Sequence, residues 1–342
     1  MKHVLPLLIS LIVSALPTVA QTTSTTILGT VTDASGALVA GAKVTSFNIN
    51  TGIRREVTSN ANGDYGFLLL DVGMYSVTVE TKGFKTETQK GIELQINQKA
   101  RVDFRLEVGA QTELVTITAE VAQLKTDESS LGQVVEQRRV VELPLNGRNL
   151  AGLAVMQPGV QFGGRMGFDG LTGGAGGVPI PGQAISISAN GQRDTNMHGT
   201  LDGVVATEPR VNTIPFSPST EAIEEFKVLS GSYSAEYGTN SGAQVMIITK
   251  SGSNAMHGSL FEFLRNDKFD AEAYFQNYFN SATAVRRPKD KLRQNQYGGV
   301  WTGPVLIPKL YNGKDKTFFM VNYEHRARRQ PGLAGKDRKS VV

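Results

Sequence analysis

The side chains that most often carry catalysis are few in this chain and lie far apart. Its 342 residues include no cysteine, which excludes thiolate catalysis, disulfide bonds, cysteine-ligated zinc and iron–sulfur clusters. The sequence contains no phosphate-binding G-x-x-x-x-G-K-S/T loop, no G-x-S-x-G nucleophile turn and no H-E-x-x-H zinc motif. The four histidines, widely separated, are His3, His198, His257 and His325. We therefore predict no catalytic residue, no cofactor and no metal site, and hence a protein that is not an enzyme.

One short segment can act in another way, because its backbone can pair with a partner. Residues 114–119 have high β propensity and lie within a linker-like region, residues 109–130. They are Leu114, Val115, Thr116, Ile117, Thr118 and Ala119. Such a segment can add as a strand to the edge of a partner's sheet, where main-chain hydrogen bonds supply the affinity. The alternative is that it forms the last strand of the domain that precedes it.

The basic charge of the chain is confined to its C-terminal end. The formal net charge is +4, from 35 Lys and Arg against 31 Asp and Glu. Residues 322–342 alone contribute +4, because they hold six Lys and Arg against Glu324 and Asp337. The rest of the chain is neutral and offers no basic face for phosphate groups, so we exclude nucleic acid as a partner. Residues 326–342 form an atypical basic tail without the alternation of a strand.

The N-terminal residues 1–20 predict a secretory signal peptide. Lys2 and His3 precede an apolar run over residues 4–13, and small residues follow before Gln21. The alternative is a transmembrane anchor, but the run is short for a bilayer core of about 30 Å. Export of a chain without cysteine suits the envelope of a bacterium.

From residue 26 onward the sequence predicts a β-sandwich. Short runs of strand-forming residues recur at 27–33, 43–48, 54–59, 75–80 and 102–108, with turns rich in Gly, Asn and Asp between them. In the last run, polar and apolar residues alternate without interruption, which predicts a single strand. Tyr65, Phe67 and Tyr75 are the predicted aromatic residues of the core.

Residues 26–108 resemble the carboxypeptidase regulatory-like domain. The resemblance rests on spaced motifs in the order of the family: Gly29-x-Val31-x-Asp33-x-x-Gly36, Gly41-Ala42-x-Val44, Asn62-Gly63-x-Tyr65-x-Phe67 and Gly73-x-Tyr75. It implies an Ig-like, transthyretin-type sandwich that, despite the name of the family, is not itself catalytic.

Residues 131–250 resemble the plug domain of TonB-dependent outer-membrane receptors, in particular the Oar-like group. The matching stretches are residues 140–149, 187–193, 201–204, 223–228, 233–238 and 241–245, and residues 247–258 continue the match. The resemblance implies an α+β plug inside a barrel. It also makes residues 114–119 similar to a TonB box, the extended segment that a periplasmic energy transducer recognises.

Within the plug region, residues 219–226 predict a short helix. Ser219 can cap its N-terminus, and acidic residues follow in the first turn. Glu224 and Glu225 are then expected on the solvated face of this helix. The loop over residues 193–202 is a candidate ligand contact, with a purely scaffolding role as the alternative.

Residues 251–325 show the pattern of the first strands of a transmembrane β-barrel. In the runs 260–264, 294–301 and 319–324, aromatic or apolar residues alternate with polar ones. Plugged barrels of this kind close about 22 strands, whereas 92 residues (342 − 250) follow Lys250. Because an open sheet edge cannot face lipid, we expect the chain to be a fragment or frameshifted product that cannot close a barrel.

These features together predict a mainly β protein with a sandwich, an α+β plug and the first strands of an incomplete transmembrane barrel. We predict the N-terminal part of an Oar-like, TonB-dependent transporter of the outer membrane, with its sandwich in the periplasm. The resemblance implies three partners: a TonB-type periplasmic energy transducer, outer-membrane lipid, and a transported ligand that is a carbohydrate, a peptide or a metal complex. The alternative is an envelope carbohydrate-binding or adhesion module, or a non-functional remnant.

Overall fold

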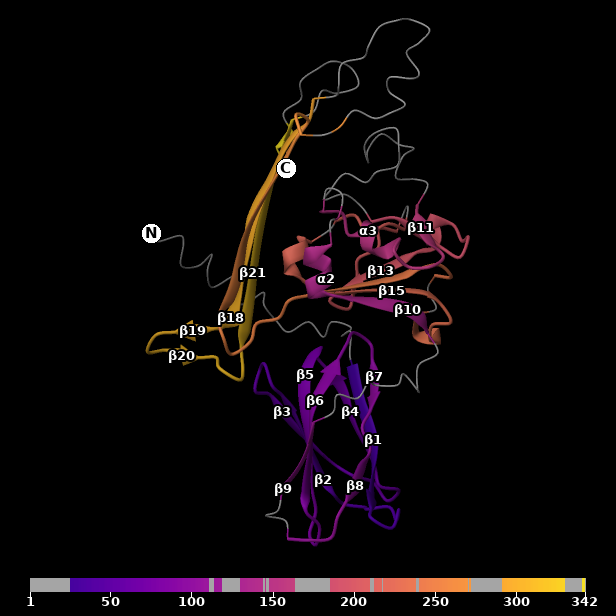
Figure 1. Cartoon of the computed structure of the whole chain (residues 1–342), viewed down its shortest axis with the longest axis vertical. Helices are drawn as coiled ribbons and strands as arrows, with labels where there is room; N and C mark the ends of the chain where they lie inside the picture. Colours follow the sequence, from indigo (N-terminus) through magenta and orange to yellow (C-terminus); the bar gives the residue numbers. More distant parts are fainter. Residues whose placement is uncertain are drawn as a thin grey trace, which may run out of the picture. The chain divides into compact units, whose positions relative to one another are not determined.

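The computed structural model describes residues 25–110, 114–118, 130–143, 145, 148–163, 185–209, 212–216, 218–237, 240–269, 271, 291–329 and 340–341. These residues are divided between two compact units. Figure 1 labels their helices and strands. One comprises Met1–Ile49, Ile53–Ser217 and Glu225–Thr249, and the other Asn50–Gly52, Pro218–Glu224 and Lys250–Val342. The predicted signal peptide, residues 1–20, lies outside the described residues. No helix in the described part of the chain has the length and apolar character needed to cross a membrane.

The N-terminal domain is a sandwich of two β-sheets, as the spacing of its strands predicts. The first sheet contains β1 (Thr25–Asp33), β4 (Asp64–Leu70), β7 (Lys99–Arg101) and β8 (Phe104–Leu106). The second has the order β3-β2-β5-β6-β9, with β2 at Lys43–Asn48, β3 at Arg54–Thr58, β5 at Gly73–Glu80, β6 at Thr86–Leu94 and β9 at Leu114–Thr118. Alternate residues of the two sheets face each other and form one hydrophobic core.

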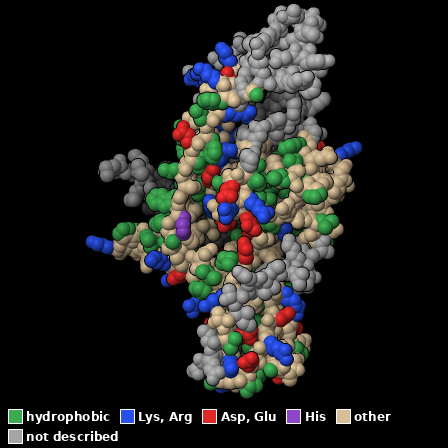
Figure 2. Space-filling view, in the orientation of Figure 1, with side chains coloured by type: hydrophobic (Ala, Val, Ile, Leu, Met, Phe, Trp, Pro, Cys, Tyr) green, Lys and Arg blue, Asp and Glu red, His purple; other side chains and the backbone are tan. Residues whose placement is uncertain are grey.

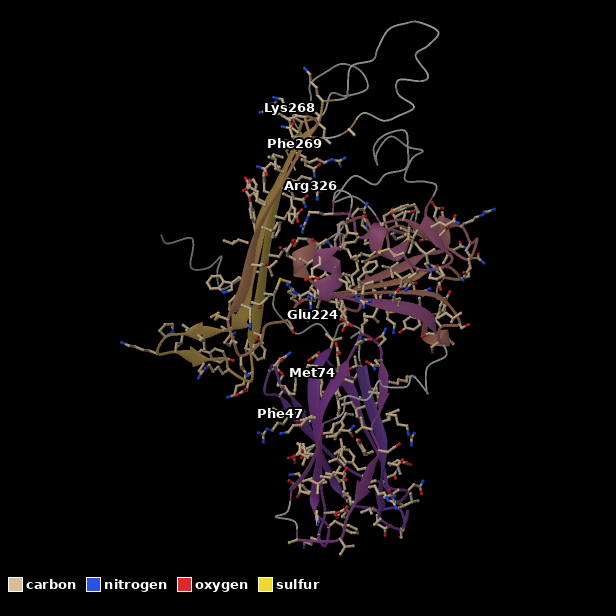
Figure 3. All side chains as sticks on the ribbon, viewed as in Figure 1. Phe47, Met74, Glu224, Lys268, Phe269 and Arg326 are labelled. Atoms are coloured by element: carbon tan, nitrogen blue, oxygen red, sulfur yellow. The ribbon has the colours of Figure 1, made fainter. Side chains whose placement is uncertain are left out.

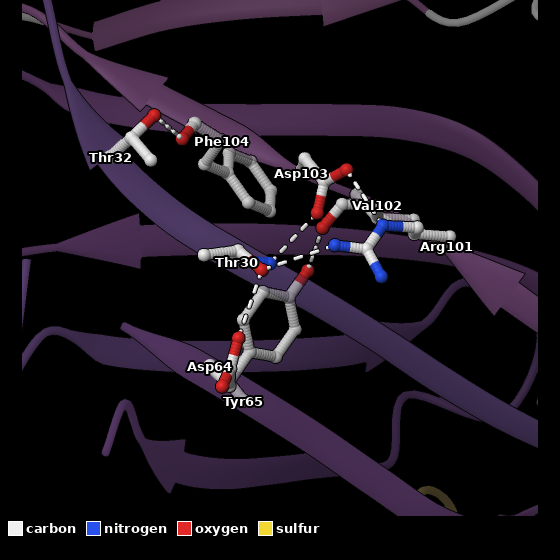
Figure 4. Close-up of polar contacts among 8 residues, drawn as sticks. All are labelled: Thr30, Thr32, Asp64, Tyr65, Arg101, Val102, Asp103 and Phe104. Atoms are coloured by element: carbon white, nitrogen blue, oxygen red, sulfur yellow. Dashed lines mark hydrogen bonds and ion pairs between the residues drawn. The ribbon is translucent and has the colours of Figure 1, made fainter. Parts of the chain in front are cut away.

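The predicted aromatic core residues are confirmed. Tyr65, Phe67 and Tyr75 are all buried in the core between the two sheets. The hydroxyl of Tyr65 donates a hydrogen bond of 2.6 Å to the backbone oxygen of Val102 (Figure 4). A buried tyrosine needs such a partner, and this one ties β4 to the segment between β7 and β8.

The prediction of a strand over residues 102–108 is confirmed in part, because only Phe104–Leu106 of this range form a strand, β8. A separate short strand, β7, precedes it, and both pair in parallel with β1, at Thr26–Leu28 and Val31–Asp33 respectively. Between them the carboxylate of Asp103 accepts a hydrogen bond of 2.8 Å from the backbone N–H of Thr30 (Figure 4). A side chain thus replaces one bond of the ladder, so the strand is interrupted although its alternation of polar and apolar residues is unbroken.

The plug region is built on a five-stranded sheet with the order β10-β15-β16-β13-β14. Its strands are β10 (Leu131–Glu136), β13 (His198–Leu201), β14 (Val204–Val205), β15 (Ile223–Gly231) and β16 (Gln244–Thr249). The smaller elements are α2 (Gln137–Glu142), α3 (Ala151–Ala154), the β11–β12 pair (Val160–Phe162 and Ile187–Ala189) and the 3₁₀ turns η3 (Asp194–Asn196), η4 (Thr220–Ala222) and η5 (Ala235–Tyr237). This mixture is the α+β arrangement that the resemblance implied.

The predicted helix over residues 219–226 is only a single 3₁₀ turn, η4, and Ser219 makes no capping hydrogen bond with its side chain. The strand β15 begins at Ile223 and carries both acidic residues that were expected on a solvated helix face. Glu225 is instead buried, with 7% of its surface exposed. Pairing with β10 provides long-range backbone bonds that outweigh the local preference for a helix.

The C-terminal strands form an open sheet in the order β17-β18-β21-β22 among the described residues. These strands are β17 (His257–Asn266), β18 (Arg293–Pro304), β21 (Phe318–Arg329) and β22 (Ser340–Val341). All neighbouring pairs are antiparallel. A short hairpin of β19 (Leu306–Ile307) and β20 (Tyr311–Asn312) lies between β18 and β21 in the chain.

Candidate functional site

The candidate coupling segment lies at the edge of the sandwich. Its described residues form β9, which pairs in parallel with β6 from Thr86↔Leu114 to Lys90↔Thr118. Within this strand, Val115 is half-buried and Thr116 is exposed, whereas Ala119 lies outside the described residues. The strand order ends at β9 in the described part of the chain. One edge of β9 is therefore paired within the chain, and its other edge carries backbone groups that a further strand can bind.

The strand that pairs with this segment, β6, contains a carboxyl group whose surroundings disfavour its ionised form. Glu87 pairs with Val79 on one side and with Val115 on the other, and only 8% of its surface is exposed. Burial raises the pKa of the Glu87 carboxyl, and the negative charge of Glu107 raises it further. The ionised form of this group therefore opposes folding of the sandwich at neutral pH.

We expect Glu87→Gln to raise the melting temperature of the sandwich at pH 7 by a few degrees. The pKa of Glu87 is higher in the folded than in the unfolded chain. The folded state therefore gains stability as pH falls from the folded pKa to the unfolded pKa of this carboxyl. The advantage of Gln should therefore vanish below pH of about 4, where both states carry a protonated Glu. Calorimetry of both variants over this range measures the effect.

The control for this substitution is Glu56→Gln, since Glu56 forms an exposed ion pair of 2.9 Å with Lys43. Exposed pairs of this kind contribute little, so we expect no gain at any pH. A gain at pH 7 from both substitutions alike would show that removal of any negative charge suffices and that burial of Glu87 is not the cause.

The plug sheet positions a second carboxyl group, which is half-buried. Glu224, labelled in Figure 3, lies near the start of β15. Burial raises the pKa of this carboxyl, and the positive charge of Lys250 opposes the shift. Burial likewise lowers the pKa of the Lys250 amine, against the negative charges of Glu224 and Glu221. Each charge thus offsets part of the burial penalty of the other, as expected for a structural pair.

The loop over residues 193–202 uses its polar groups within the plug. Asp202 has a positive φ of 49°, and its carboxylate accepts hydrogen bonds of 2.8 Å from both the N–H and the hydroxyl of Thr249. Burial lowers the pKa of His198. In the described part of the chain, no group of three or more His, Asp or Glu side chains could hold a metal ion. These contacts favour the scaffolding role for the loop.

One face of the C-terminal sheet is polar. On this face Gln296 donates a hydrogen bond of 2.6 Å to the carboxylate of Glu324, and Arg326 forms an ion pair of 3.2 Å with the same carboxylate. Arg326 is labelled on β21 in Figure 3. A further bond of 3.4 Å joins Gln294 to Gln296. Phe261 and Phe263 belong to this face too, because they pair with Gly298 and Gln296.

The opposite face of the same sheet is apolar and exposed (Figure 2). The register places Trp301 beside Val321, and Gly299 between Leu260 and Tyr323. Leu260 is 92% exposed, and the side chains of Trp301, Val321 and Tyr323 are each more than half exposed. An aromatic and aliphatic face opposite a polar one is the composition of outer-membrane strands. The expected alternation is confirmed in β18 and β21. It fails in β17, where Phe261 and Phe263 lie on the polar face and Glu262 lies on the apolar one.

Two segments of the chain match known protein families. Residues 26–107 match the carboxypeptidase regulatory-like domain, and residues 248–335 match an outer membrane beta barrel domain. Over 305 residues the chain is 27% identical to the TonB-dependent transporter Oar of Myxococcus xanthus. The chain is a homologue of the TonB-dependent transporter Oar. Homology and the barrel-domain match place it in the outer membrane. The alignment covers 88% of the chain but only 27% of the length of this Oar protein.

Solved structures show more distant likenesses to parts of the Oar homologue. The siderophore receptor PirA from Acinetobacter baumannii is 19% identical, with a TM-score of 0.37, over 59% of this chain and 25% of PirA. Catechol 1,2-dioxygenase from Acinetobacter radioresistens is 16% identical, with a TM-score of 0.21, over 29% of this chain and 55% of the enzyme. Both scores are too low to bear on function.

Sequence reasoning missed two buried charged residues of the plug, Glu225 and Lys227. They are 7% and 3% exposed and lie two positions apart in β15, so they share one face of the sheet. The spacing Glu225, Lys227, Leu229 is a strand alternation that could have been recognised. Their partners could not, because they lie in the sandwich, 129 and 131 residues earlier in the chain.

Proposed function

We propose that this chain provides the sandwich, the plug and the first barrel strands of a TonB-dependent receptor that takes up a ligand across the outer membrane. In this proposal residues 114–119 bind a TonB-type periplasmic energy transducer. Homology to the Oar transporter supports the receptor class. The identity of the ligand is left among carbohydrates, peptides and metal complexes.

The observation that carries the proposal is the place of β9 at a sheet edge. Its five residues pair with only one neighbouring strand in the described part of the chain. Parallel pairing is slightly weaker per residue than antiparallel pairing, so a competing strand can displace β6 or add to the open edge of β9. β9 also lies between the sandwich and the plug in sequence. A pull on this segment would therefore reach the plug through the backbone.

Substitution of Ile117 tests the coupling contact. Ile117→Pro removes a backbone donor and fixes φ at a value unsuited to continued pairing. We expect capture of the full chain by the periplasmic C-terminal domain of the transducer to weaken about tenfold or more, as loss of one or two backbone hydrogen bonds implies. Pull-down and surface-binding assays measure the loss.

The matched control is Ile117→Val, which keeps the backbone donor and the β propensity and should bind normally. The melting temperature of the sandwich is measured for both variants. Normal capture of Ile117→Pro together with a destabilised sandwich would show that β9 is only the last strand of the domain. That result would favour an envelope binding module over an energised receptor.

A further inference from the structure

The turn between β6 and β7 has an unusual tip. Gln98 donates its backbone N–H to the oxygen of Gln95 at 3.0 Å, and the side-chain oxygen of Gln98 accepts a bond of 2.7 Å from the N–H of Gln95. Asn97 has a positive φ of 51°, a conformation that asparagine tolerates well. The tip residue Ile96 is nevertheless 0% exposed. An isoleucine at the tip of a connecting turn is normally solvated, so another part of the molecule must cover it.

The plug sheet covers this tip. Ile96 packs with Leu229 of β15 and with Met246 and Ile248 of β16, in a hydrophobic cluster separate from the sandwich core. Partly buried apolar residues from both domains surround the cluster: Val72, Val134, Tyr233 and Tyr237. The sandwich and these plug strands belong to one compact unit. The turn therefore contributes the central side chain of a small core that the two domains share.

Two buried charges bind the backbone of the same residue. The carboxylate of Glu225 accepts a hydrogen bond of 2.6 Å from the N–H of Ile96, and the amine of Lys227 donates one of 3.0 Å to its oxygen. Bonds of this kind, with one charged partner, are stronger than neutral ones. Burial of either charge without partners would be unfavourable. Glu225 and Lys227 thus match the donor and the acceptor of one peptide residue.

The neighbouring residue of the turn also contacts the plug. The side-chain amide of Asn97 donates to the hydroxyl of Tyr237 at 2.5 Å and contacts the sulfur of Met246 at 3.0 Å. Both residues at the tip therefore have plug partners, one through its backbone and side chain and the other through its side chain alone. The plug therefore contacts the turn by apolar packing, by hydrogen bonds from charged groups and by a side-chain hydrogen bond.

We propose that the turn over residues 95–98 is a docking element that fixes the sandwich to strands β15 and β16 of the plug. The sandwich then moves with the plug as one body. The docking element rests on contacts of the described residues alone, so it holds whether or not residues 114–119 bind a transducer. Its failure and the failure of the proposed function are separate outcomes.

Lysine labelling of the full chain tests the docked state. In the docked protein Lys227 is 3% exposed, whereas the side chain of Lys43 is 49% exposed and serves as an internal reference. An amine-reactive acetylating reagent, read by mass spectrometry, should label Lys227 roughly tenfold more slowly than Lys43. Ile96→Asp puts a carboxylate beside Glu225 and should bring Lys227 close to the rate of Lys43.

The matched control is Leu38→Asp, because Leu38 is an apolar residue of another sandwich loop and is already 55% exposed. It should leave Lys227 protected. Equal labelling of Lys227 and Lys43 in the unmodified protein would overturn the proposal. Continued protection of Lys227 in the Ile96→Asp variant would overturn it as well.

A second variant tests the same contact by changing the plug residues, and it leaves the sequence of the sandwich unchanged. The double substitution Glu225→Met and Lys227→Met replaces both charges by apolar groups of similar size, which proteins often tolerate. Hydrogen exchange at the amide of Ile96 should accelerate roughly tenfold, while the amides of β5 and β16 stay protected. Unchanged exchange at Ile96 would overturn the proposal, whatever Ile96→Asp does to the sandwich itself.

Discussion

Gly29→Ala should abolish the folded sandwich in the full chain. Gly29 lies in β1, between the residues that pair with β7 and the residues that pair with β8. An added Cβ would overlap the carbonyl oxygen of Val102 and would lie 2.8 Å from Cε1 of Tyr65. That oxygen belongs to the backbone and accepts the hydrogen bond of the Tyr65 hydroxyl. It therefore cannot shift without breaking this hydrogen bond in the core. We expect a loss of about 4 kcal/mol or more, the range of the most disruptive substitutions.

Hydrogen exchange of peptides that cover β1 and β4 measures this loss. The control is Gly41→Ala in the same domain, where φ is +73° and no atom lies within 4 Å of the added Cβ. It should cost only about 1 kcal/mol, the penalty of the left-handed backbone. Equal protection of β1 in the two variants would mean that the close approach of Val102 does not limit this position.

Leu260→Arg should strongly reduce recovery of the chain from outer membranes. Because Leu260 is 92% exposed, an arginine there displaces no packing within the protein. In lipid the same change costs about 2–4 kcal/mol near the middle of a bilayer. The effect therefore depends on the surroundings, and it should be absent when the variant is compared with the unmodified chain in aqueous buffer. Fractionation of cell envelopes and partition into vesicles measure it.

The control is Ser259→Arg, one residue earlier and on the opposite face of β17, where Ser259 is exposed and pairs with Val300. Substitutions on a polar inner face are tolerated far better than those on the lipid face. Equal recovery of the two arginine variants would show that the apolar face of this sheet does not contact lipid.

The sequence predicts the strands of the sandwich well because apolar and polar residues alternate along a strand that is buried on one face. Residues 43–48 were predicted as a strand and form β2 over Lys43–Asn48. Residues 102–108 alternate equally well, yet Asp103 interrupts the strand by bonding to Thr30, 73 residues earlier. Alternation reports which face is buried and carries no information on which backbone bonds a side chain replaces.

The plug shows a different limit of prediction. Ser219 and the acidic residues after it satisfy the local rules for a helix start, but β15 begins at Ile223. The strand is stabilised by β10, and two of its charged residues are stabilised by Ile96 of the sandwich. The candidate coupling segment could be proposed from composition alone, whereas its parallel pairing with β6 depends on the fold of the whole domain.

The two ends of β6 carry the two contacts on which both proposals depend. Residues Thr86–Lys90 pair with β9, and the strand leads after Leu94 into the turn that holds Ile96. The bulge at Gly91, with a φ of +80°, lies between these two parts of the chain. Any coupling between binding events at the two ends of this strand must be reciprocal. If release of β9 lowers the binding constant of the plug for Ile96 by some factor, undocking of Ile96 raises the equilibrium constant for release of β9 by the same factor.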